Sequence, residues 1–290
     1  MSIPDPMSSP SVSVVIATLG GPTLLPTIEL LNRGSVVPGE ILICIPEAEA
    51  ASFAMPQIGN IKIIATSIRG QVAQRAVGFR AAANEFVLQL DDDMSIDSNC
   101  IERLLEVVKK EPKVAASAAL IDVVSNESVY KNKRSGTILD AIYQWLMNGK
   151  RGYQQGRIDK AGFPAGVDPL LGSEAPIDVE WIAGGCVMHR RENLILEPFF
   201  PFPGKAYCED IIHSHHLSAR RIRLVVVPNA RCGLEIISPL DVPWRRLRKE
   251  LYADFKARRY FMRLSGRGLA RMYLFYAIRL LSYTLKAVSR

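Results

Sequence analysis

Short apolar runs alternate with segments of helical periodicity in the first part of the chain. The runs are five to seven residues long and end at turn-forming or charged residues, which is typical of strands buried inside a sheet. Strands that alternate with helices form a mostly parallel sheet with helices on both faces, so we predict an α/β fold. The pattern predicts strands over residues 11–17, 40–45, 61–65 and 86–90, and helices over residues 23–33 and 71–84.

The later part of the chain has a less regular pattern. A helix closed by Pro112 follows Asp97, which we expect to cap it. Residues 148–176 are rich in Gly, Pro and polar side chains and too long for a simple turn, so we predict a functional or mobile loop there. Further strands are predicted over residues 114–124 and 223–228, and helices over residues 209–220 and 138–147, the latter with Ile138, Ile142, Trp145 and Leu146 on one side.

Three consecutive carboxylates, Asp91, Asp92 and Asp93, follow the apolar run that ends at Leu90. Side chains alternate along an extended backbone, so Asp91 and Asp93 point the same way. Ligands of parallel sheets bind beyond the carboxyl ends of the strands, and carboxylates suit Mg²⁺ or Mn²⁺. The cluster therefore indicates a metal that holds a substrate phosphate, and the alternative is a polar turn ahead of the next helix.

Composition narrows the class of protein. The chain of 290 residues is long enough for one large α/β domain, or for one domain with an appendage. Its five cysteines are scattered and form no CxxC pair, which argues against a disulfide framework or a zinc site and for a reducing cytoplasm. The first residues lack the basic and apolar regions of a signal peptide. No GxGxxG or Walker A pattern follows a strand, which argues against a dinucleotide or P-loop site.

Six short motifs occur in an order that resembles the family 2 inverting glycosyltransferases of the GT-A fold. The resemblance covers residues 11–235, and each motif gains weight from its place among the others. The motifs are residues 13–18, Gly70 with residues 74–78, Leu90 with the three acids, residues 183–186 with Arg190 and Arg191, Glu209 with Asp210, and residues 228–230.

The resemblance implies a metal-dependent enzyme that moves a sugar from a nucleotide-diphosphate donor to a glycan or lipid-linked glycan. The donor would be a UDP-, GDP- or dTDP-sugar, and the cofactor Mn²⁺ or Mg²⁺. The chain would divide into a flexible arm at residues 1–10, a GT-A domain at 11–237 and a basic helical tail at 238–290. Within the domain, residues 11–97 would bind the nucleotide and residues 98–237 the acceptor.

The same resemblance implies roles for individual residues. Asp210 would be the catalytic base, although an acidic pair in a first helical turn is also favoured by the helix dipole alone. Arg75 could instead snorkel from its helix, Trp181 could be a core residue, and Arg190 could belong to an ordinary charged turn. The expected metal ligands are Asp93 and Asp91; the donor contacts are Thr18, Glu47, Arg75, Asp91 and Asp92; and the acceptor contacts are Gly184, Gly185, Trp181, Glu209 and Arg190.

Three positions depart from the family pattern. Ile45-Pro46-Glu47 stands where the family commonly has Asp-Asp-Gly-Ser, so Glu47 is the candidate for contact with the base. Ala76 replaces an Asn, and Leu234 with Glu235 stands near the position of a late His. These differences leave the identity of the nucleotide open. The cluster of His213, His215 and His216 does not place three ligands on one helix face, so we expect no metal there.

The C-terminal segment carries the positive charge of the chain. Residues 241–290 hold thirteen Lys and Arg against three Asp and Glu, a net charge of +10, whereas the rest of the chain has −3. Two apolar runs, 272–278 and 280–285, are separated by Arg279, and each is too short to span a bilayer. The segment predicts an amphipathic helix on an anionic membrane surface, or a helix that packs on the body with a solvated basic face. No nucleic-acid reader motif accompanies it.

We therefore expect a cytoplasmic enzyme that is peripheral on the inner face of the membrane and binds no nucleic acid. Two other functions stay open at this stage. A nucleotidyltransferase or pyrophosphorylase has a similar fold, but it usually carries a basic Gly-rich phosphate loop early in the chain. The Gly20-Gly21 turn of this sequence has no Lys or Arg next to it. A noncatalytic protein that binds a membrane or nucleic acid through the basic tail would need neither acidic motif.

Overall fold

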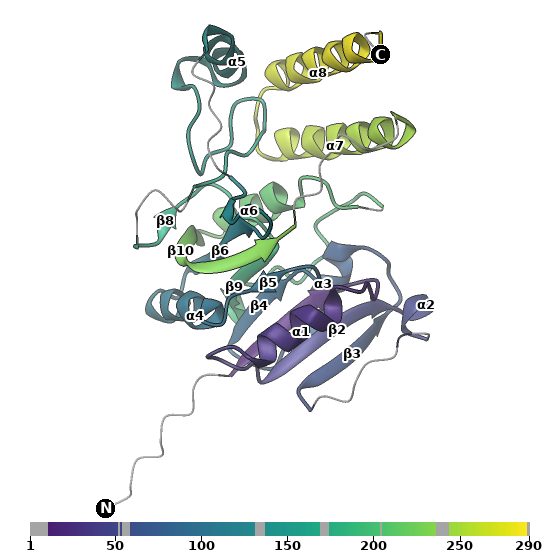
Figure 1. Ribbon diagram of the computed structural model, residues 1–290, viewed down its shortest axis with the longest axis vertical. Coiled ribbons are helices and arrows are strands. Elements are labelled where there is room, and N and C mark those ends of the chain that lie inside the picture. The colour runs from purple at the N-terminus through teal and green to yellow at the C-terminus, as the bar shows by residue number, and fades with distance from the viewer. Residues whose placement is uncertain are drawn as a thin grey trace, which may run out of the picture.

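The computed structural model describes residues 11–51, 53, 59–130, 137–168, 174–203, 205–235 and 244–288 (Figure 1). The arm predicted at residues 1–10 and residues 169–173 of the predicted loop lie outside this part of the chain. Strands and helices alternate through the first half, as predicted.

The first half forms a parallel sheet covered on both faces. The strands are β1 Val12–Ala17, β2 Glu40–Pro46, β3 Ile61–Thr66 and β4 Phe86–Leu90, in the spatial order β3-β2-β1-β4. Helix α1 Leu24–Asn32 packs on the face of β1 that carries Val14, and α3 Gln71–Ala81 packs on the face that carries Val15. The predicted strands are confirmed to within one residue at either end.

The second half makes the sheet mixed. Strand β9, Cys186–Arg190, lies antiparallel between β4 and β6 Val114–Asp122, and β6 pairs in parallel with β10 Arg223–Leu234. The sequence pattern did not predict β9, and the expectation of a mostly parallel sheet holds only for the first half. Strand β10 continues past its predicted end at residue 228 because an irregularity between Val227 and Arg231 shifts its register and lets pairing resume.

Short elements complete the sheet edges and turns. Asn99 occupies the N-cap of α4, Cys100–Lys110, so the predicted cap by Asp97 is wrong; the carbonyl of Asp97 accepts from the Cys100 N–H at 3.0 Å instead. The remaining elements are β5 Ser95–Ile96, β7 Glu127–Ser128, β8 Ile177–Asp178, α2 Glu47–Ala50, α5 Ile138–Asn148, η1 Gly149–Arg151, η3 Arg191–Asn193 and α6 Glu209–Ala219.

The basic tail forms two helices, α7 Trp244–Leu264 and α8 Ala270–Val288, that pack on the body. Phe261 and Met262 of α7 and Met272 of α8 are buried in the main hydrophobic core. Buried Arg258 donates to the carbonyl of Gly162 at 2.5 Å. The tail is therefore part of the folded body, which agrees with the second of the two expectations for it. Within the described residues, no helix combines the length and apolar character that crossing a bilayer requires.

Candidate active site

The three acids stand at the carboxyl end of β4, where neighbouring elements hold them. Residue Leu90 pairs with Ile16 of β1, so Thr18 comes to lie beside Asp92 and its hydroxyl donates to that carboxylate. The hydroxyl of Thr27 on α1 bonds to the carbonyls of Asp92 at 3.2 Å and of Met94 at 3.0 Å. Together these contacts keep the acidic turn at the edge of the sheet, as the sequence predicted.

Arg75 joins the acids of β4 to the acids of α6. Its side chain is buried in α3 and forms ion pairs with Asp91 and Glu209. Gln71, one turn earlier, donates to the same oxygen of Asp91 at 2.9 Å. Burial lowers the pKa of Arg75, but the Glu209 and Asp91 carboxylates more than offset this effect and raise it above its ordinary value. Two nitrogens of its guanidinium are engaged by carboxylates, so Arg75 bridges the two groups of acids, and its direct contact with the donor stays a prediction.

Glu209 and Asp210 open α6 next to a glycine turn. Cys208, which precedes them, adopts a left-handed conformation with φ of 59°, and its thiol donates to Asp254 of α7 at 3.3 Å. One oxygen of Asp210 accepts from the N–H of Gly184 at 3.0 Å. Strand β9, α6 and the tail therefore all contribute to the position of this acidic pair.

Burial raises the pKa of Asp210 to about 8, with further contributions from the charges on Glu209 and Asp91. Burial also raises the pKa of Glu209, and its ion pair with Arg75 acts in the opposite direction. The two carboxyl groups thus differ in their surroundings: Glu209 is ion-paired, whereas Asp210 accepts a backbone hydrogen bond. Because the two carboxyl groups also interact with one another, the raised pKa of Asp210 depends on the charge of Glu209.

The raised pKa predicts a pH-dependent stability. Between the ordinary pKa of an aspartate, about 4, and the value of about 8, the folded state holds a proton on Asp210 that the unfolded state has lost. The free energy of unfolding should therefore fall as the pH rises through this window. The Asp210→Asn variant lacks this titration, so its stability relative to wild type should grow with pH. Urea denaturation of both proteins from pH 5 to 9 measures the difference, and a constant difference would contradict the raised pKa.

Gly184 and Gly185 allow the backbone to approach both groups of acids. A Cβ on Gly184 would lie 2.6 Å from an oxygen of Asp210, and a Cβ on Gly185 would lie 2.5 Å from Cε of Met94. The carbonyl of Gly184 accepts from Gln89 at 2.6 Å, and that of Gly185 accepts from the N–H of Asp91 at 2.9 Å. The predicted glycine segment, called the Gly184–Gly185 wall below, thus lies against both Asp91 and Asp210.

Glu47 and Asp93 are the predicted site residues with exposed side chains. Glu47 begins α2 at the carboxyl end of β2, and β2 pairs in parallel with β1, which leads to Thr18. Partial burial and the charges on Asp91 and Asp92 raise the pKa of Asp93. Such repulsion among carboxylates is relieved when a cation binds them. Over the described ranges, no group of three His, Cys, Asp or Glu side chains is arranged to hold a metal, so a cation here would need ligands from a substrate or water.

Two predicted acceptor residues, Trp181 and Arg190, are held by contacts elsewhere in the fold. Trp181 is buried, donates from Nε1 to the carbonyl of Ala165 at 3.0 Å and packs edge-on against Tyr130, so it is a core residue. Arg190 pairs with Glu85 and lies opposite Phe86, at the amino end of β4. The five residues of β9 carry Arg190 away from the acids, and the prediction that it contacts the acceptor is corrected accordingly.

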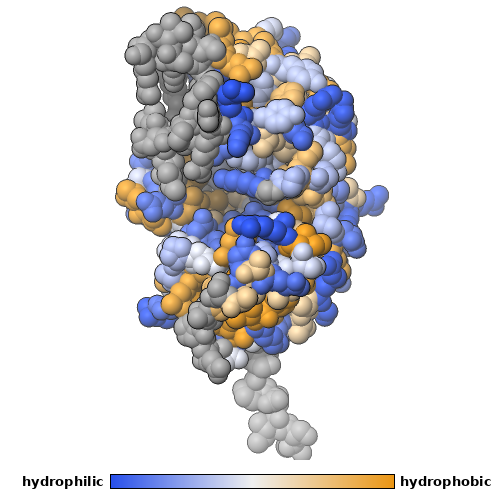
Figure 2. All heavy atoms as spheres, turned by 90° about the vertical axis from the view of Figure 1, so that its right-hand side faces the viewer, coloured by the Kyte–Doolittle hydropathy of each residue, from blue (hydrophilic) through white to orange (hydrophobic). Residues whose placement is uncertain are grey.

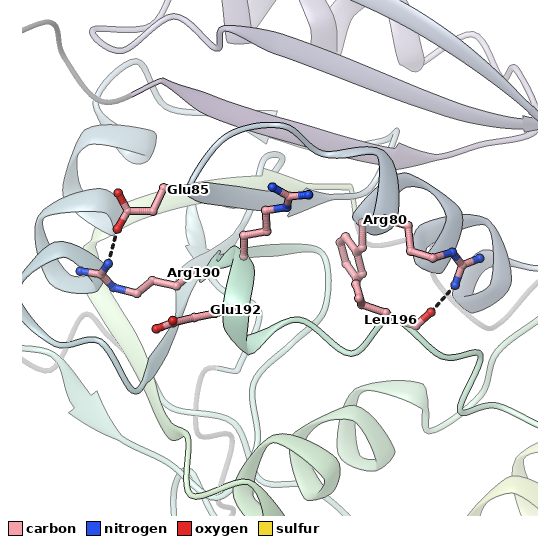
Figure 3. Close-up of a pocket in the computed structure, with 7 residues that line it drawn as sticks. Arg80, Glu85, Arg190, Glu192 and Leu196 are labelled. Atoms are coloured by element: carbon pink, nitrogen blue, oxygen red, sulfur yellow. Dashed lines mark hydrogen bonds and ion pairs between the residues drawn. The ribbon is translucent and has the colours of Figure 1, made fainter.

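Arg190 instead borders a cavity of about 500 Å³ near the amino end of β4. In Figure 3, Glu85 and Arg190 point toward one another at one side of this cavity, and Arg80 is directed at Leu196 on the other. Arg190 is ion-paired with Glu85, and no residue of the acidic motifs lines this cavity.

The histidines of α6 pack against aromatic side chains. His213 is buried and stacks on Phe199 with 5.4 Å between ring centroids, and burial lowers its pKa well below the ordinary value. The sequence reasoning missed two buried glutamines of the site. Gln74 donates to the carbonyls of Thr18 at 2.9 Å and Cys44 at 2.7 Å, and Gln89 holds Gly184. The sequence signal for Gln89 was a polar residue inside an apolar strand, and for Gln74 a polar residue on the buried side of a helix.

A parallel sheet with acids at its carboxyl edge, joined to a half that supplies a second acidic pair, is the architecture of the GT-A glycosyltransferases. The structure of GalNAc-T7 with UDP, GalNAc and Mn²⁺ is similar, with a TM-score of 0.58 and 16% identity over 79% of this chain and 44% of that one. A mannosyltransferase of Pyrobaculum calidifontis, PcManGT, in complex with GDP-Man and Mn²⁺, gives a TM-score of 0.50 and 16% identity over 88% of this chain and 65% of that one.

Residues 47–167 match the model of glycosyl transferase family 2. No curated protein matches the chain in sequence. The alignments span less than two thirds of both similar structures, so those structures support the fold and not a shared substrate. Residues 47–167 are thus similar to glycosyl transferase family 2, and the fold is that of the GT-A glycosyltransferases.

Proposed function

We propose that this protein transfers a sugar from a nucleotide-diphosphate donor to a hydroxyl group of a glycan or lipid-linked glycan, with inversion at the anomeric carbon. The observation that carries the proposal is the bridge formed by Arg75 between Asp91 and Glu209. It holds the acids at the edge of the parallel sheet close to the residue next to Asp210. In this proposal the acids around Asp91 serve the leaving diphosphate, and Asp210 serves the attacking hydroxyl. The bridge by Arg75 would keep the two close together.

The acids suit a divalent cation bound together with a diphosphate. One oxygen of Asp91 is used by Arg75 and Gln71, which leaves its second oxygen and the exposed carboxylate of Asp93 as ligands. Mn²⁺ and Mg²⁺ are commonly held by one or two carboxylates plus substrate phosphates. Both similar structures contain Mn²⁺ with a UDP or GDP compound. A cation here would neutralise the charge that develops on the leaving diphosphate.

The donor nucleotide would lie along the edge formed by β1, β2 and β4. Asp92, whose carboxylate accepts from the Thr18 hydroxyl, would contact the ribose or base. Glu47, at the end of β2, is the candidate for contact with the base. Arg75, which is ion-paired with Asp91, would act on the donor directly or through this carboxylate.

Asp210 is the proposed catalytic base. Its hydrogen bond to the N–H of Gly184 fixes one oxygen, and in the ionised form of Asp210 the other oxygen can take the proton of the acceptor hydroxyl. A base that acts on the side of the sugar opposite the diphosphate produces inversion. Glu209, held by Arg75, would position the acceptor together with the Gly184–Gly185 wall.

Asp93 tests the metal role directly. Replacing Asp93 by Asn is expected to abolish Mn²⁺-dependent binding of the nucleotide, because one of the two carboxylate ligands loses its charge. Binding is measured by calorimetry with UDP, GDP and dTDP, with Mn²⁺ and with EDTA. The matched control is Asp97→Asn, an exposed aspartate four positions later that contacts none of the acids. Equal Mn²⁺-dependent affinity in the wild type and the Asp93 variant would exclude this ligand.

The overall reaction is tested with a panel of nucleotide sugars in the presence of Mn²⁺. Thermal shift first selects the donor, because a ligand that binds only the folded state raises its melting temperature. Transfer to glycan and lipid-linked acceptors is then followed, and NMR determines the anomeric configuration of the product. A product that keeps the configuration of the donor would overturn the inverting mechanism, and the absence of any stabilising nucleotide would overturn the proposal as a whole.

The place of action is the last part of the proposal. The net charge of +10 between residues 241 and 290 supports a peripheral position on an anionic membrane, which in the cell would be its cytoplasmic face. A lipid-linked acceptor would be concentrated on the same surface.

A further inference from the structure

Helix α5 exposes an apolar stripe. Ile138, Leu139, Ile142 and Trp145 are 80%, 78%, 50% and 56% exposed. Leu139, Ile142 and Trp145 follow Ile138 by one, four and seven residues, and this spacing places all four on one side of the helix. The sequence predicted such a one-sided helix, and the structure turns this side to solvent instead of to the core.

Helix α8 repeats the pattern. Tyr273, Leu274, Leu280 and Leu281 are 42%, 39%, 49% and 61% exposed. They are the first, second, eighth and ninth residues of the segment 273–281, a spacing that places them on one side of the helix. The opposite side of the same helix is already packed, because Met272 is buried in the core. The outward apolar side chains of α8 are thus additional to those that attach it to the body.

The two helices lie at the same end of the molecule, away from α1 and β3 (Figure 1). Arg271 of α8 donates to the carbonyls of Trp145, at 3.0 Å, and Leu146 at the end of α5. Figure 2, which views the molecule from the right-hand side of Figure 1, shows apolar side chains at its upper end, at the level of α8. The two helices that carry the stripes are therefore in contact at one end of the fold.

Exposed basic side chains belong to the same part of the fold as these stripes. Lys150 and Arg151 are exposed directly after α5, and Arg279 is exposed on α8. Helix α8 contains no Asp or Glu in its 19 residues, and α5 contains one, Asp140. Single exposed apolar residues are ordinary, but two apolar stripes on helices in contact, in a basic part of the fold, are typical of a surface that binds a partner.

We propose that α5 and α8 form a docking face for an anionic lipid bilayer. Apolar side chains, among them Trp145 and Tyr273, enter the region between headgroups and acyl chains, where such rings are favoured. The basic side chains contact lipid phosphates. The near absence of acids and the excess of positive charge favour an anionic membrane over a second copy of this equally basic face.

The docking face is connected to the candidate active site. Arg267, between α7 and α8, donates to the carbonyls of Ile158 and Asp159 at 3.2 Å and pairs with Glu180. Glu180 precedes the segment that leads to the Gly184–Gly185 wall. If the proposed function holds, on which this step rests, an acceptor carried by a membrane lipid would meet the acceptor side of the site while the bilayer contacts α5 and α8.

The test uses full-length protein and vesicles of phosphatidylglycerol and phosphatidylcholine. Because Met272 of α8 fills part of the hydrophobic core, removal of α8 would uncover that core, so surface substitutions are preferable to truncation. A variant with Ile138→Ser, Leu139→Ser and Ile142→Ser is expected to bind at least about ten-fold more weakly than wild type in vesicle cosedimentation. Val123→Ser with Val124→Ser, at a turn where these residues are 49% and 78% exposed, is the matched control and should bind like wild type.

Three further readouts complete the test. Binding should weaken with salt, and the fluorescence change on adding vesicles should be reduced in Trp145→Phe. Nucleotide binding by the serine variant should equal that of wild type, so failure of docking and failure of the proposed enzymatic function are distinguishable. Wild type that ignores anionic vesicles at low salt would overturn the docking face. The proposal would also be overturned if light scattering shows that the stripe supports self-association while the serine variant binds vesicles as well as wild type does.

Discussion

Replacing Asp210 by Asn is expected to lower the rate of sugar transfer by about 10²–10⁴-fold while the donor still binds. The amide has nearly the shape of the carboxyl group, and its oxygen can still accept from the N–H of Gly184. It cannot take a proton from the acceptor hydroxyl. The loss should therefore fall on the transfer step and leave the geometry of the wall intact.

The measurement compares transfer under saturating donor and acceptor with nucleotide affinity determined by calorimetry. Asp93→Asn gives the opposite pattern, because it removes a proposed metal ligand and should weaken the binding of the nucleotide itself. Near-normal transfer by the Asp210 variant would remove this residue from the mechanism. Loss of nucleotide binding in the same variant would place Asp210 on the donor side instead.

The parts of the fold that depend on local pattern were predictable. Strands β1 to β4 are short apolar runs that end in turns, and the acids after β4 mark the edge of the sheet. Strand β9 was not predicted, because it begins at a glycine pair, contains His189 and pairs antiparallel between β4 and β6. Its position depends on contacts that are far apart in the sequence.

The same cause explains the errors at the site. Arg190 follows the glycine pair closely in the sequence, but an extended strand of five residues carries it to the other end of β4. Arg75 lies 134 positions from Glu209, so its bridging role has no local signal. Trp181 could be a core residue or a platform for a sugar, and only the packing against Tyr130 decides between them.

The tail shows the limit of a charge argument. Its net charge predicted a basic surface, but helices with apolar residues on two sides can pack and expose apolar surface at once. In α8, Met272 is buried in the body, whereas Leu281 is exposed. The prediction of a packed helix and the proposal of membrane contact are therefore compatible with each other.

The second large effect is expected at Arg75. Arg75→Met keeps much of the length of the side chain but leaves Glu209 and Asp91 next to Asp210 without their cation. Removal of one partner of a buried ion pair typically costs about 3–5 kcal/mol, because the remaining charge is not compensated. We expect a loss of this size in urea denaturation at pH 7, and a smaller loss at pH 5, where the carboxyl groups take up protons more readily.

Two further variants separate charge from packing. In Arg75→Met with Glu209→Gln, one uncompensated charge is gone, so the double variant should recover part of the stability that Arg75→Met loses. Arg75→Lys keeps the charge, but a single ammonium group lacks the fork that reaches two carboxylates, and an intermediate stability is expected.

Arg80→Met, on the same helix with an exposed side chain, is the matched control and should change stability by less than about 1 kcal/mol. An Arg75→Met protein as stable as the control would mean that the bridge contributes no net stability. If the double variant is no more stable than Arg75→Met, the loss belongs to packing in α3 and not to the unpaired carboxylate. If the double variant does recover, the positive charge of Arg75 is what allows two groups of acids, 16 and 134 positions away in the sequence, to share one buried space.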